Sequence, residues 1–315
     1  MRVSRRSVLR AAVTAAVPAC VAGCTSTPPP APPELVLATG PDGAVFREIG
    51  GALAAALADE LPATRVVERQ TGASVENVRR LRAGEVHLGL SSLDPLVDGA
   101  ALLSAEDPGG ISAVGRLYDS FMQVAVPVDS PVRTLADLAG RPVSFGPSES
   151  GTEFTATRLL SLLGVEVDAR RMTHADAAEE LIAGSLDAFL SLTGIPTPAI
   201  ADHLHEFPLR LLDLPAEAEQ LAETYPGPYV PATIPATTYG NLGPCHTFAV
   251  PNLLLARTSL DPDVVEVVTR TVFTQSARIA AGHPEASRIN VRTGIATGQI
   301  PLHHGAARWF RSTKR

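Results

Sequence analysis

The chain has 315 residues, of which 45% are hydrophobic and 19% charged, and its formal net charge is −7. This composition is that of a globular protein with enough chain for one large domain or two smaller ones. Aromatic residues make up only 4% of the chain, and the charge is negative, so neither a base-stacking surface nor a basic phosphate-binding face is expected. We therefore expect no nucleic-acid partner.

The first 23 residues have the pattern of an export signal. Arginines precede an apolar stretch over residues 11–23, which at about 13 residues is shorter than the roughly 20 that a membrane-spanning helix needs. The pair Arg5-Arg6 resembles the twin-arginine export signal. The stretch ends in the letters VAGC and resembles a bacterial lipobox, so we predict that Cys24 is lipidated. A simple secretory signal cleaved near Cys24 is the alternative.

Residues 24–33 are expected to tether a folded part to the membrane. The letters TSTPPPAPP follow Cys24, and a segment so rich in proline adopts an extended polyproline II conformation. Because Cys20 leaves with the signal and Cys24 carries lipid, Cys245 has no partner for a disulfide. We interpret Cys245 as a structural thiol, with a nucleophile as the minor alternative.

From residue 34 onward, short β-rich runs alternate with helical patterns. The first two strands are expected at residues 35–38 and 65–68, with a helix at residues 46–60 between them. Ser74 is the expected N-cap of the next helix, Gly84 ends it, and a strand follows at residues 86–90. A second set follows. Its helices are expected at residues 135–138 (capped by Thr134), 152–163 and 176–183, and its strands at residues 143–145 and 186–192. This β-α-β alternation predicts an α/β fold dominated by parallel strands.

Two long apolar runs, residues 121–128 and 247–255, flank the middle of the chain. They predict two crossing hinge strands between two lobes, the first made of residues 34–122 plus 255–315 and the second of residues 123–254. A single continuous doubly wound domain is the alternative.

Four loops follow predicted strands, at residues 39–44, 91–94, 146–152 and 193–197. In open α/β sheets, ligands bind beyond the carboxyl ends of the strands. The loops are rich in glycine and hydroxyl residues, and two lead directly into helices, whose N-termini favour an anion. We therefore expect a carboxylate ligand there, although each loop taken alone could be an ordinary cap or turn.

Other site chemistries have weaker support in the sequence. Neither G-x-G-x-x-G nor G-x-x-x-x-G-K-[ST] is present, so no nucleotide cofactor is expected. The pairs His203/His205 and His303/His304 lack a matching cysteine or carboxylate cluster, so no metal is expected. No G-x-S-x-G motif is present, and we expect no catalytic residues.

Several segments together resemble the TAXI family of TRAP-transporter solute receptors. They are ATGPDGAVFREIGGALA (38–54), TGASVENVRRLRAGEVHLGL (71–90), LADLAGRPVSFGPSESGTEFTATRLL (135–160), YVPATIPATTY (229–239) and PLHHGAAR (301–308). The resemblance implies a two-lobed periplasmic-binding-protein fold of type II that closes over a small carboxylate such as glutamate, or over a 2-oxo acid. It also implies an extracytoplasmic, membrane-anchored receptor with a membrane permease as partner. The ligand contacts expected on this basis are Thr39, Gly40, Phe46, Arg47, Ser74, Ser92, Gly151, Thr152, Thr193 and Gly194.

The chain departs from the family pattern at positions that bear on the ligand. Phe46-Arg47 stands where the family usually has two tyrosines, and Ser92 where it often has glutamine. Arg47 could bind a carboxylate with two hydrogen bonds or face solvent. Glu149 replaces a usual glycine and would repel a carboxylate unless it points away or binds an amine. Two alternative functions remain, a receptor that signals to a membrane sensor and an enzyme on the same scaffold.

Overall fold

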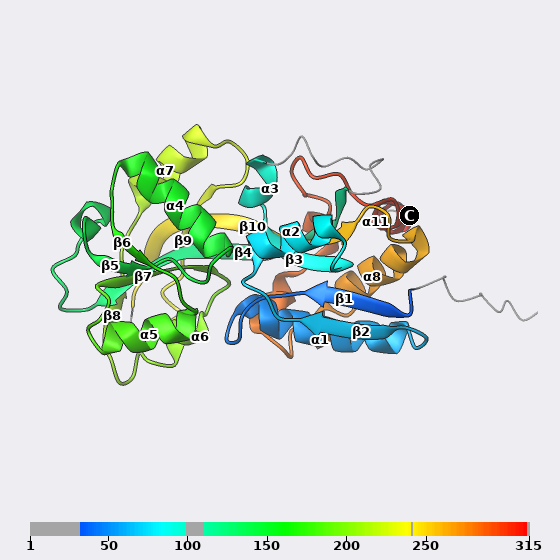
Figure 1. Ribbon diagram of the computed structural model, residues 1–315, viewed down its shortest axis with the longest axis horizontal. Helices are drawn as coiled ribbons and strands as arrows, with labels where there is room; N and C mark the ends of the chain where they lie inside the picture. The colour runs from blue at the N-terminus through cyan, green and yellow to red at the C-terminus, as the bar shows by residue number, and fades with distance from the viewer. Residues whose placement is uncertain (1–31, 99–109, 241, 314–315) are drawn as a thin grey trace, which may run out of the picture.

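The computed structural model (Figure 1) describes residues 32–98, 110–240 and 242–313. The predicted export signal (residues 1–23), the lipidation site Cys24 and all but the last two residues of the tether (24–33) lie outside this range. Within it, ten strands form one sheet with helices packed against it, so the predicted α/β class is confirmed.

The strands, in chain order, are β1 (Glu34–Ala38), β2 (Arg65–Arg69), β3 (Leu88–Ser92), β4 (Ile111–Pro127), β5 (Pro142–Ser144), β6 (Asp168–Arg170), β7 (Ala188–Thr193), β8 (Leu209–Leu211), β9 (Val230–Ile234) and β10 (Cys245–Arg257). The helices are α1 (Val45–Glu60), α2 (Ser74–Ala83), α3 (Asp94–Asp98), α4 (Gly151–Leu163), α5 (His174–Ile182), α6 (Pro198–Ala201), α7 (Pro215–Thr224), α8 (Pro262–Thr274), α9 (Ser276–Ile279), α10 (Val291–Gly294) and α11 (His304–Ser312), with short 3₁₀ turns η2 (Leu135–Leu138) and η3 (Pro284–Arg288).

The sheet is mixed, with the strand order β2-β1-β3-β10-β4-β7-β5-β6, and β8 and β9 pair with β4 and β10. The strands β1, β2 and β3 are parallel, as are β5, β6 and β7. Every antiparallel pairing among the described strands involves β4 or β10. The parallel β-α-β units therefore lie on either side of two long antiparallel strands.

The strands β4 and β10 connect the two ends of the molecule. In Figure 1, α4 to α7 gather at one end and α1, α2, α8 and α11 at the other, and β4 and β10 pass between them. We use first lobe and second lobe for the two residue sets predicted above. β4 starts at Ile111, well before the predicted apolar run at 121–128. The early part of the strand was not predicted because it carries polar residues such as Arg116 and Asp119.

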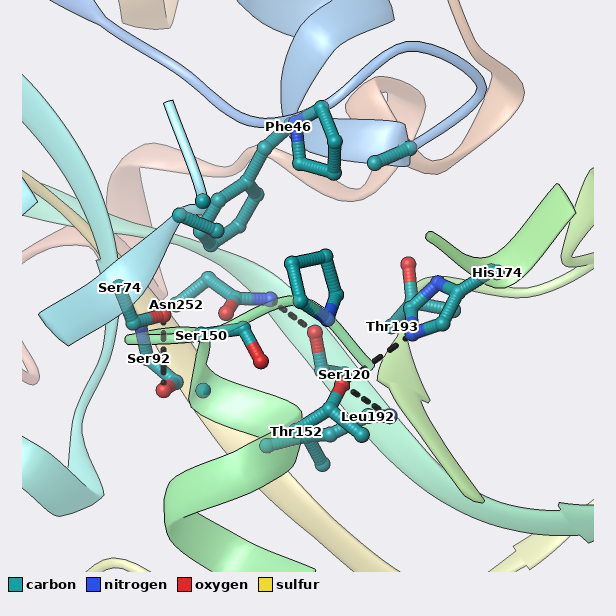
Figure 2. Close-up of a pocket in the computed structure, with 16 residues that line it drawn as sticks. Phe46, Ser74, Ser92, Ser120, Ser150, Thr152, His174, Leu192, Thr193 and Asn252 are labelled. Atoms are coloured by element: carbon teal, nitrogen blue, oxygen red, sulfur yellow. Dashed lines mark hydrogen bonds between the residues drawn. The ribbon is translucent and has the colours of Figure 1, made fainter. Parts of the chain in front are cut away.

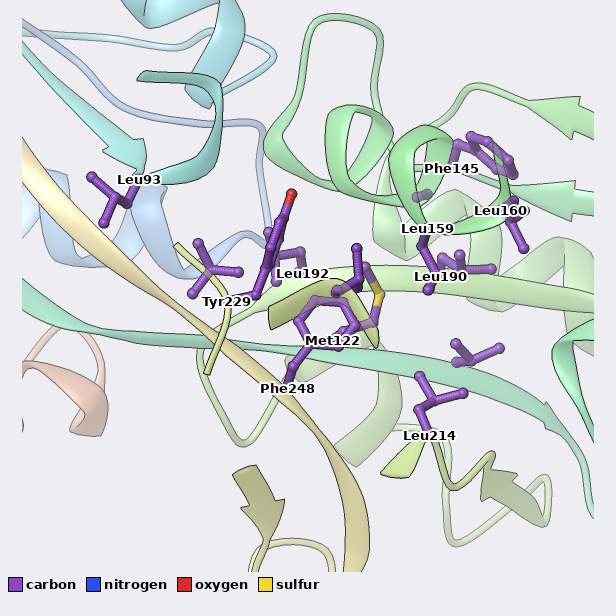
Figure 3. Close-up of a cluster of buried hydrophobic side chains, with 14 of the residues drawn as sticks. Leu93, Met122, Phe145, Leu159, Leu160, Leu190, Leu192, Leu214, Tyr229 and Phe248 are labelled. Carbon is purple, nitrogen blue, oxygen red and sulfur yellow. The ribbon is translucent and has the colours of Figure 1, made fainter. Parts of the chain in front are cut away.

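Apolar side chains hold the hinge strands in place. Met122 of β4 and Phe248 of β10 are fully buried in one cluster with Leu190 of β7 and Leu159 of α4 (Figure 3). The same cluster contains Val36 of β1, so this core is continuous from one lobe to the other. Burying a side chain of this size stabilises the fold by about 1.5–3 kcal/mol.

Helix ends follow the predicted caps in part. Gly84 ends α2 in the left-handed conformation, as predicted, and Thr134 is the N-cap of η2. The prediction that Ser74 is an N-cap was wrong, because the N-cap of α2 is Ala73, with φ 96°, and Ser74 is the first helical residue. The tight turn at Ala73 directs the Ser74 hydroxyl towards Ser92 instead.

Three further features bear on the sequence predictions: membrane-spanning helices, metal-binding clusters and the thiol of Cys245. Among the helices within the described ranges, none is long and apolar enough to cross a membrane. The described residues also contain no cluster of three or more His, Cys, Asp or Glu side chains suited to a metal ion. Cys245 is a buried free thiol whose pKa is raised to about 12 by burial. At neutral pH it is therefore protonated and a poor nucleophile.

Candidate functional site

A cavity lies between the two lobes and takes residues from both of them (Figure 2). The cavity is small, because only about 30 Å³ of it is open to water-sized groups, which is room for about one or two of them in this structure. The residues that line it are Pro41, Ala44, Phe46, Gly72, Ala73, Ser74, Ser92, Ser120, Pro147, Ser150, Gly151, Thr152, His174, Leu192, Thr193 and Asn252.

Each of the four predicted loops contributes to this lining. The loops follow β1, β3, β5 and β7. Their contributions are, in this order, Pro41 and Ala44; Ser92; Pro147, Ser150, Gly151 and Thr152; and Thr193. Parallel strands end at one edge, which brings the loops after β1 and β3 together and, separately, the loops after β5 and β7. The two parallel sets run in opposite directions, because β3, β10, β4 and β7 are successively antiparallel, and the loops of both sets meet at the cavity.

Four helices begin at the cavity. Phe46, Ser74, Thr152 and His174 lie in the first turns of α1, α2, α4 and α5, and all four residues line the cavity. N–H groups in the first turn of a helix lack acceptors within the helix. The positive ends of four helix dipoles therefore lie around one small space, which favours a negatively charged group there.

The lobes touch at Gly151. The Ser74 hydroxyl oxygen accepts hydrogen bonds from the backbone N–H of Ser92 at 3.0 Å and from its hydroxyl at 3.1 Å. A Cβ atom added at Gly151 would lie 2.8 Å from both hydroxyl oxygens. Only glycine fits at residue 151 with the two lobes this close.

Thr152 and His174 form a neutral pair within the second lobe. The Thr152 hydroxyl oxygen accepts the Leu192 N–H at 3.0 Å and lies 3.3 Å from Nε2 of His174. Burial lowers the pKa of His174 to about 4, so this ring is neutral at neutral pH. The Thr152 side chain therefore connects α4 to β7, while its backbone N–H remains at the start of α4.

Asn252 and Ser120 come from the middle of the hinge strands, and the sequence analysis missed both. The Asn252 side-chain amide donates to the Ser120 hydroxyl oxygen at 2.8 Å (Figure 2). The amide oxygen of Asn252 is buried and has no hydrogen-bond partner among the described residues. A polar residue within the apolar run 247–255 was the available signal. The sequence analysis also missed His174, for which the sequence carries no signal other than its place directly after the helix cap Thr173.

Thr39, Gly40, Arg47 and Gly194, predicted to contact a ligand, lie outside the lining. The Thr39 hydroxyl donates to Glu68 at 2.9 Å, and Arg47 forms ion pairs with Glu68 at 2.7 Å and Asp42 at 3.3 Å. Arg47 is thus held by two acids in this structure, and its role as a carboxylate partner stays a prediction.

The two glycines are packed against neighbours. A Cβ atom at Gly40 would lie 3.1 Å from Cβ of Phe46, and one at Gly194 would lie 3.0 Å from Glu285. Of the ten predicted contacts, Phe46, Ser74, Ser92, Gly151, Thr152 and Thr193 remain at the cavity.

Glu149 points away from the cavity. Its carboxylate accepts two hydrogen bonds from Arg79 of the first lobe, at 3.0 and 2.9 Å. This hydrogen-bonded guanidinium lowers the pKa of Glu149, so the carboxylate is ionised. Glu149 therefore does not repel an anionic ligand in the cavity, as the sequence had suggested it would. Its carboxylate instead links the two lobes through Arg79.

A second contact between the lobes is built around Asp94. Its carboxylate is fully buried and accepts hydrogen bonds from Thr155 at 2.5 Å and from the Tyr229 hydroxyl at 3.1 Å, both from the second lobe. Burial raises the pKa of Asp94. Arg158 lies against the rings of Tyr225 and Tyr229 and donates to the Tyr229 hydroxyl.

The fold and this inter-lobe cavity define the class of protein as an α/β periplasmic-binding-protein fold of type II. The family model described as the NMT1-like family matches residues 37–313, and the chain belongs to that family. The chain is similar to the alkanesulfonate-binding protein SsuA from Xanthomonas axonopodis pv. citri bound to MOPS, with a TM-score of 0.51 and 16% identity over 90% of this chain and 91% of that one.

Two further solved structures are similar to the chain at lower scores. The periplasmic aliphatic sulphonate binding protein SsuA from Escherichia coli has a TM-score of 0.44 and 18% identity, over 82% of this chain and 78% of that one. The arginine-, lysine-, histidine-binding protein ArtJ from Geobacillus stearothermophilus has a TM-score of 0.49 and 13% identity, over 80% and 94%.

Proposed function

We propose that this protein is an extracytoplasmic solute receptor that captures a small carboxylate or amino acid by closing two lobes over it. The observation that carries the proposal is the cavity between the lobes, where α1, α2, α4 and α5 all begin. An anion bound there would lie at the positive N-terminal ends of helices from both lobes and would stabilise the closed form. The described residues that line the cavity include no acid paired with a base, so the lining gives no support to a catalytic role.

The motifs resembling the TAXI family support a finer proposal, in which the receptor delivers its solute to a TRAP-type permease. The export signal pattern and Cys24 support a lipid-anchored location outside the cytoplasm. A receptor of the same fold that reports the solute to a membrane sensor is the second candidate. Deletion of a permease gene encoded beside this chain would abolish solute uptake in the first case only.

The first experiment is a thermal-shift screen of the protein purified after export, against amino acids, dicarboxylates, 2-oxo acids and hydroxy acids. A ligand at 100 times its dissociation constant stabilises the fold by about 2.7 kcal/mol. The variant Gly151→Ala tests the site, because its methyl group would collide with Ser74 and Ser92 of the other lobe only on closure.

We expect Gly151→Ala to lose the ligand-induced shift in melting temperature, measured against its own ligand-free melting curve. Gly51→Ala is the matched control, because it makes the same change within helix α1, where an added Cβ atom has ordinary contacts, the nearest at 3.4 Å. A ligand shift that survives in Gly151→Ala would place binding elsewhere. No shift across the whole panel would refute the receptor proposal.

A further inference from the structure

The cavity is lined almost entirely by groups without charge. No Asp, Glu, Lys or Arg is among its lining residues in the described part of the chain, and its only titratable side chain is His174. Two arginines on helices that begin at the cavity are already paired, Arg47 of α1 with Glu68 and Arg79 of α2 with Glu149. A buried charge without a partner is strongly unfavourable. The only charge for which the cavity offers compensation is therefore one anion at the helix N-termini.

This lining disfavours ligands with more than one charged group. The ammonium group of an amino acid would lie among the positive ends of four helices with no carboxylate to pair with it. A second carboxylate would have no arginine or lysine partner. Both classes would have to be desolvated without compensation, so the lining favours a monocarboxylate.

Asn252 and Ser120 add a second, independent observation. The Asn252 amide oxygen is buried with no hydrogen-bond partner. Its amide nitrogen donates to the Ser120 oxygen, which leaves the Ser120 hydrogen free to donate, because no acceptor for it is seen among the described residues. Two residues of the cavity lining thus hold a buried unpaired acceptor next to an unpaired donor.

A ligand hydroxyl group matches this pair, because it can donate to Asn252 and accept from Ser120 at once. A keto group only accepts, so it would leave the Asn252 oxygen unpaired. An ammonium group only donates, so it would leave the Ser120 hydroxyl unpaired. A methylene group would leave both unpaired, at the cost that buried unsatisfied polar groups carry.

We propose that the cavity binds a short hydroxy monocarboxylate, with its carboxylate at the helix N-termini and its hydroxyl group on Asn252 and Ser120. This inference rests on the proposed receptor function and narrows its ligand class. Among the small carboxylates and amino acids considered above, it selects those with one negative charge and one alcohol.

The test is isothermal titration calorimetry of the exported protein with ligands that differ in one group. Lactate, pyruvate, alanine and propionate carry a hydroxyl, keto, ammonium or methylene group on the same skeleton, and malate adds a second carboxylate. The set 3-hydroxybutyrate, acetoacetate and butyrate repeats the comparison on a longer skeleton. We expect the hydroxy monocarboxylate of at least one set to bind at least about tenfold more tightly than its analogues.

The variant Ser120→Ala is expected to reduce this preference for hydroxyl over methylene by about tenfold. Ser112→Ala is the matched control, because Ser112 is a buried serine of the same strand whose hydroxyl bonds to Thr258, away from the cavity. Melting curves of both variants check that they fold. Asn252→Asp, which keeps the shape and adds a negative charge, is expected to abolish binding of every carboxylate.

The outcomes separate this inference from the proposed function. Equal or tighter binding of the keto, amino or dicarboxylate analogue would overturn the hydroxy-acid inference and leave the receptor function standing. The same holds if Ser120→Ala and Ser112→Ala bind alike. If no solute of the screen or of these sets binds, and Gly151→Ala changes nothing, both proposals fail.

Discussion

At the scale of single residues, burial decides the charge of the groups around the cavity. His174 lies at the start of α5 with no acid beside it, and burial alone lowers its pKa to about 4. In the unfolded chain the pKa of histidine is about 6.5. As pH falls, the unfolded state therefore takes up a proton first, and folded-state stability is lost.

This sign gives a prediction for stability against pH. Neutral His174 contributes fully above about pH 6.5, and its contribution of about 3 kcal/mol is lost progressively towards pH 4. We expect His174→Gln to remove this part of the pH dependence in urea unfolding at a series of pH values. Other histidines whose pKa is lowered by burial, such as the half-buried His87, act in the same direction, so the difference between variant and parent is the measured quantity. The exposed His205, changed to Gln, is the control, and equal slopes in parent and His174→Gln would contradict the prediction.

At the scale of elements, α2 and the loop before α4 meet through one ion pair. Glu149 adopts φ 57°, a left-handed conformation that a residue other than glycine adopts at a cost of about 1–2 kcal/mol. The backbone N–H of Glu76 donates to the Glu149 carbonyl at 3.0 Å, and Arg79 binds its carboxylate. The loop is thus held in an unfavourable conformation by contacts with the other lobe.

We expect Glu149→Gln to weaken ligand binding only slightly. Arg79 and Glu149 are 50% and 44% exposed, and an exposed ion pair contributes about 0–1 kcal/mol, less at high salt. The affinity should fall by no more than about fivefold at low salt, and the difference should vanish at about 1 M salt. Asp168→Asn, which breaks the exposed pair with Arg170 inside the second lobe, is expected to have no effect. A large loss that persists at high salt would show that Glu149 acts on the ligand itself.

At the scale of the whole molecule, we expect Asp94 to couple closure of the two lobes to protonation. In the closed form, burial raises its pKa, and opening returns the carboxyl group to water and towards a pKa of about 3.9. Protonated Asp94 therefore favours the closed form below the open-state pKa. This contribution is lost as pH rises through the raised, closed-state pKa.

The corresponding experiment compares the radius of gyration of the parent and Asp94→Asn by small-angle scattering without ligand. The parent is expected to open as pH rises, whereas Asp94→Asn, whose amide oxygen can still accept from Thr155 and Tyr229, should remain at least as compact throughout. Asp168→Asn again serves as the control. An identical pH response in the parent and Asp94→Asn would exclude Asp94 as the coupled group.

The sequence by itself determined the elements and the loops that reach the cavity. The spacing of hydrophobic residues, the glycines that end helices and the hydroxyl residues that cap them are local signals. The positions of β1, α1, α4 and β7 therefore followed from stretches of about ten residues. The α/β class, and the place of each loop after the carboxyl end of a parallel strand, then followed from the topology that such an alternation allows.

Only the tertiary structure decided which side chains face the cavity. Asn252 and Ser120 meet across 132 residues of chain, and Arg79 and Glu149 across 70, separations at which no local pattern carries information. Arg47 turned to Glu68 for the same reason, because the partner of a charged side chain is set by the packing of neighbouring elements. A sequence pattern specifies which groups are available, and the close packing of strands from different parts of the chain specifies which of them remain unpaired.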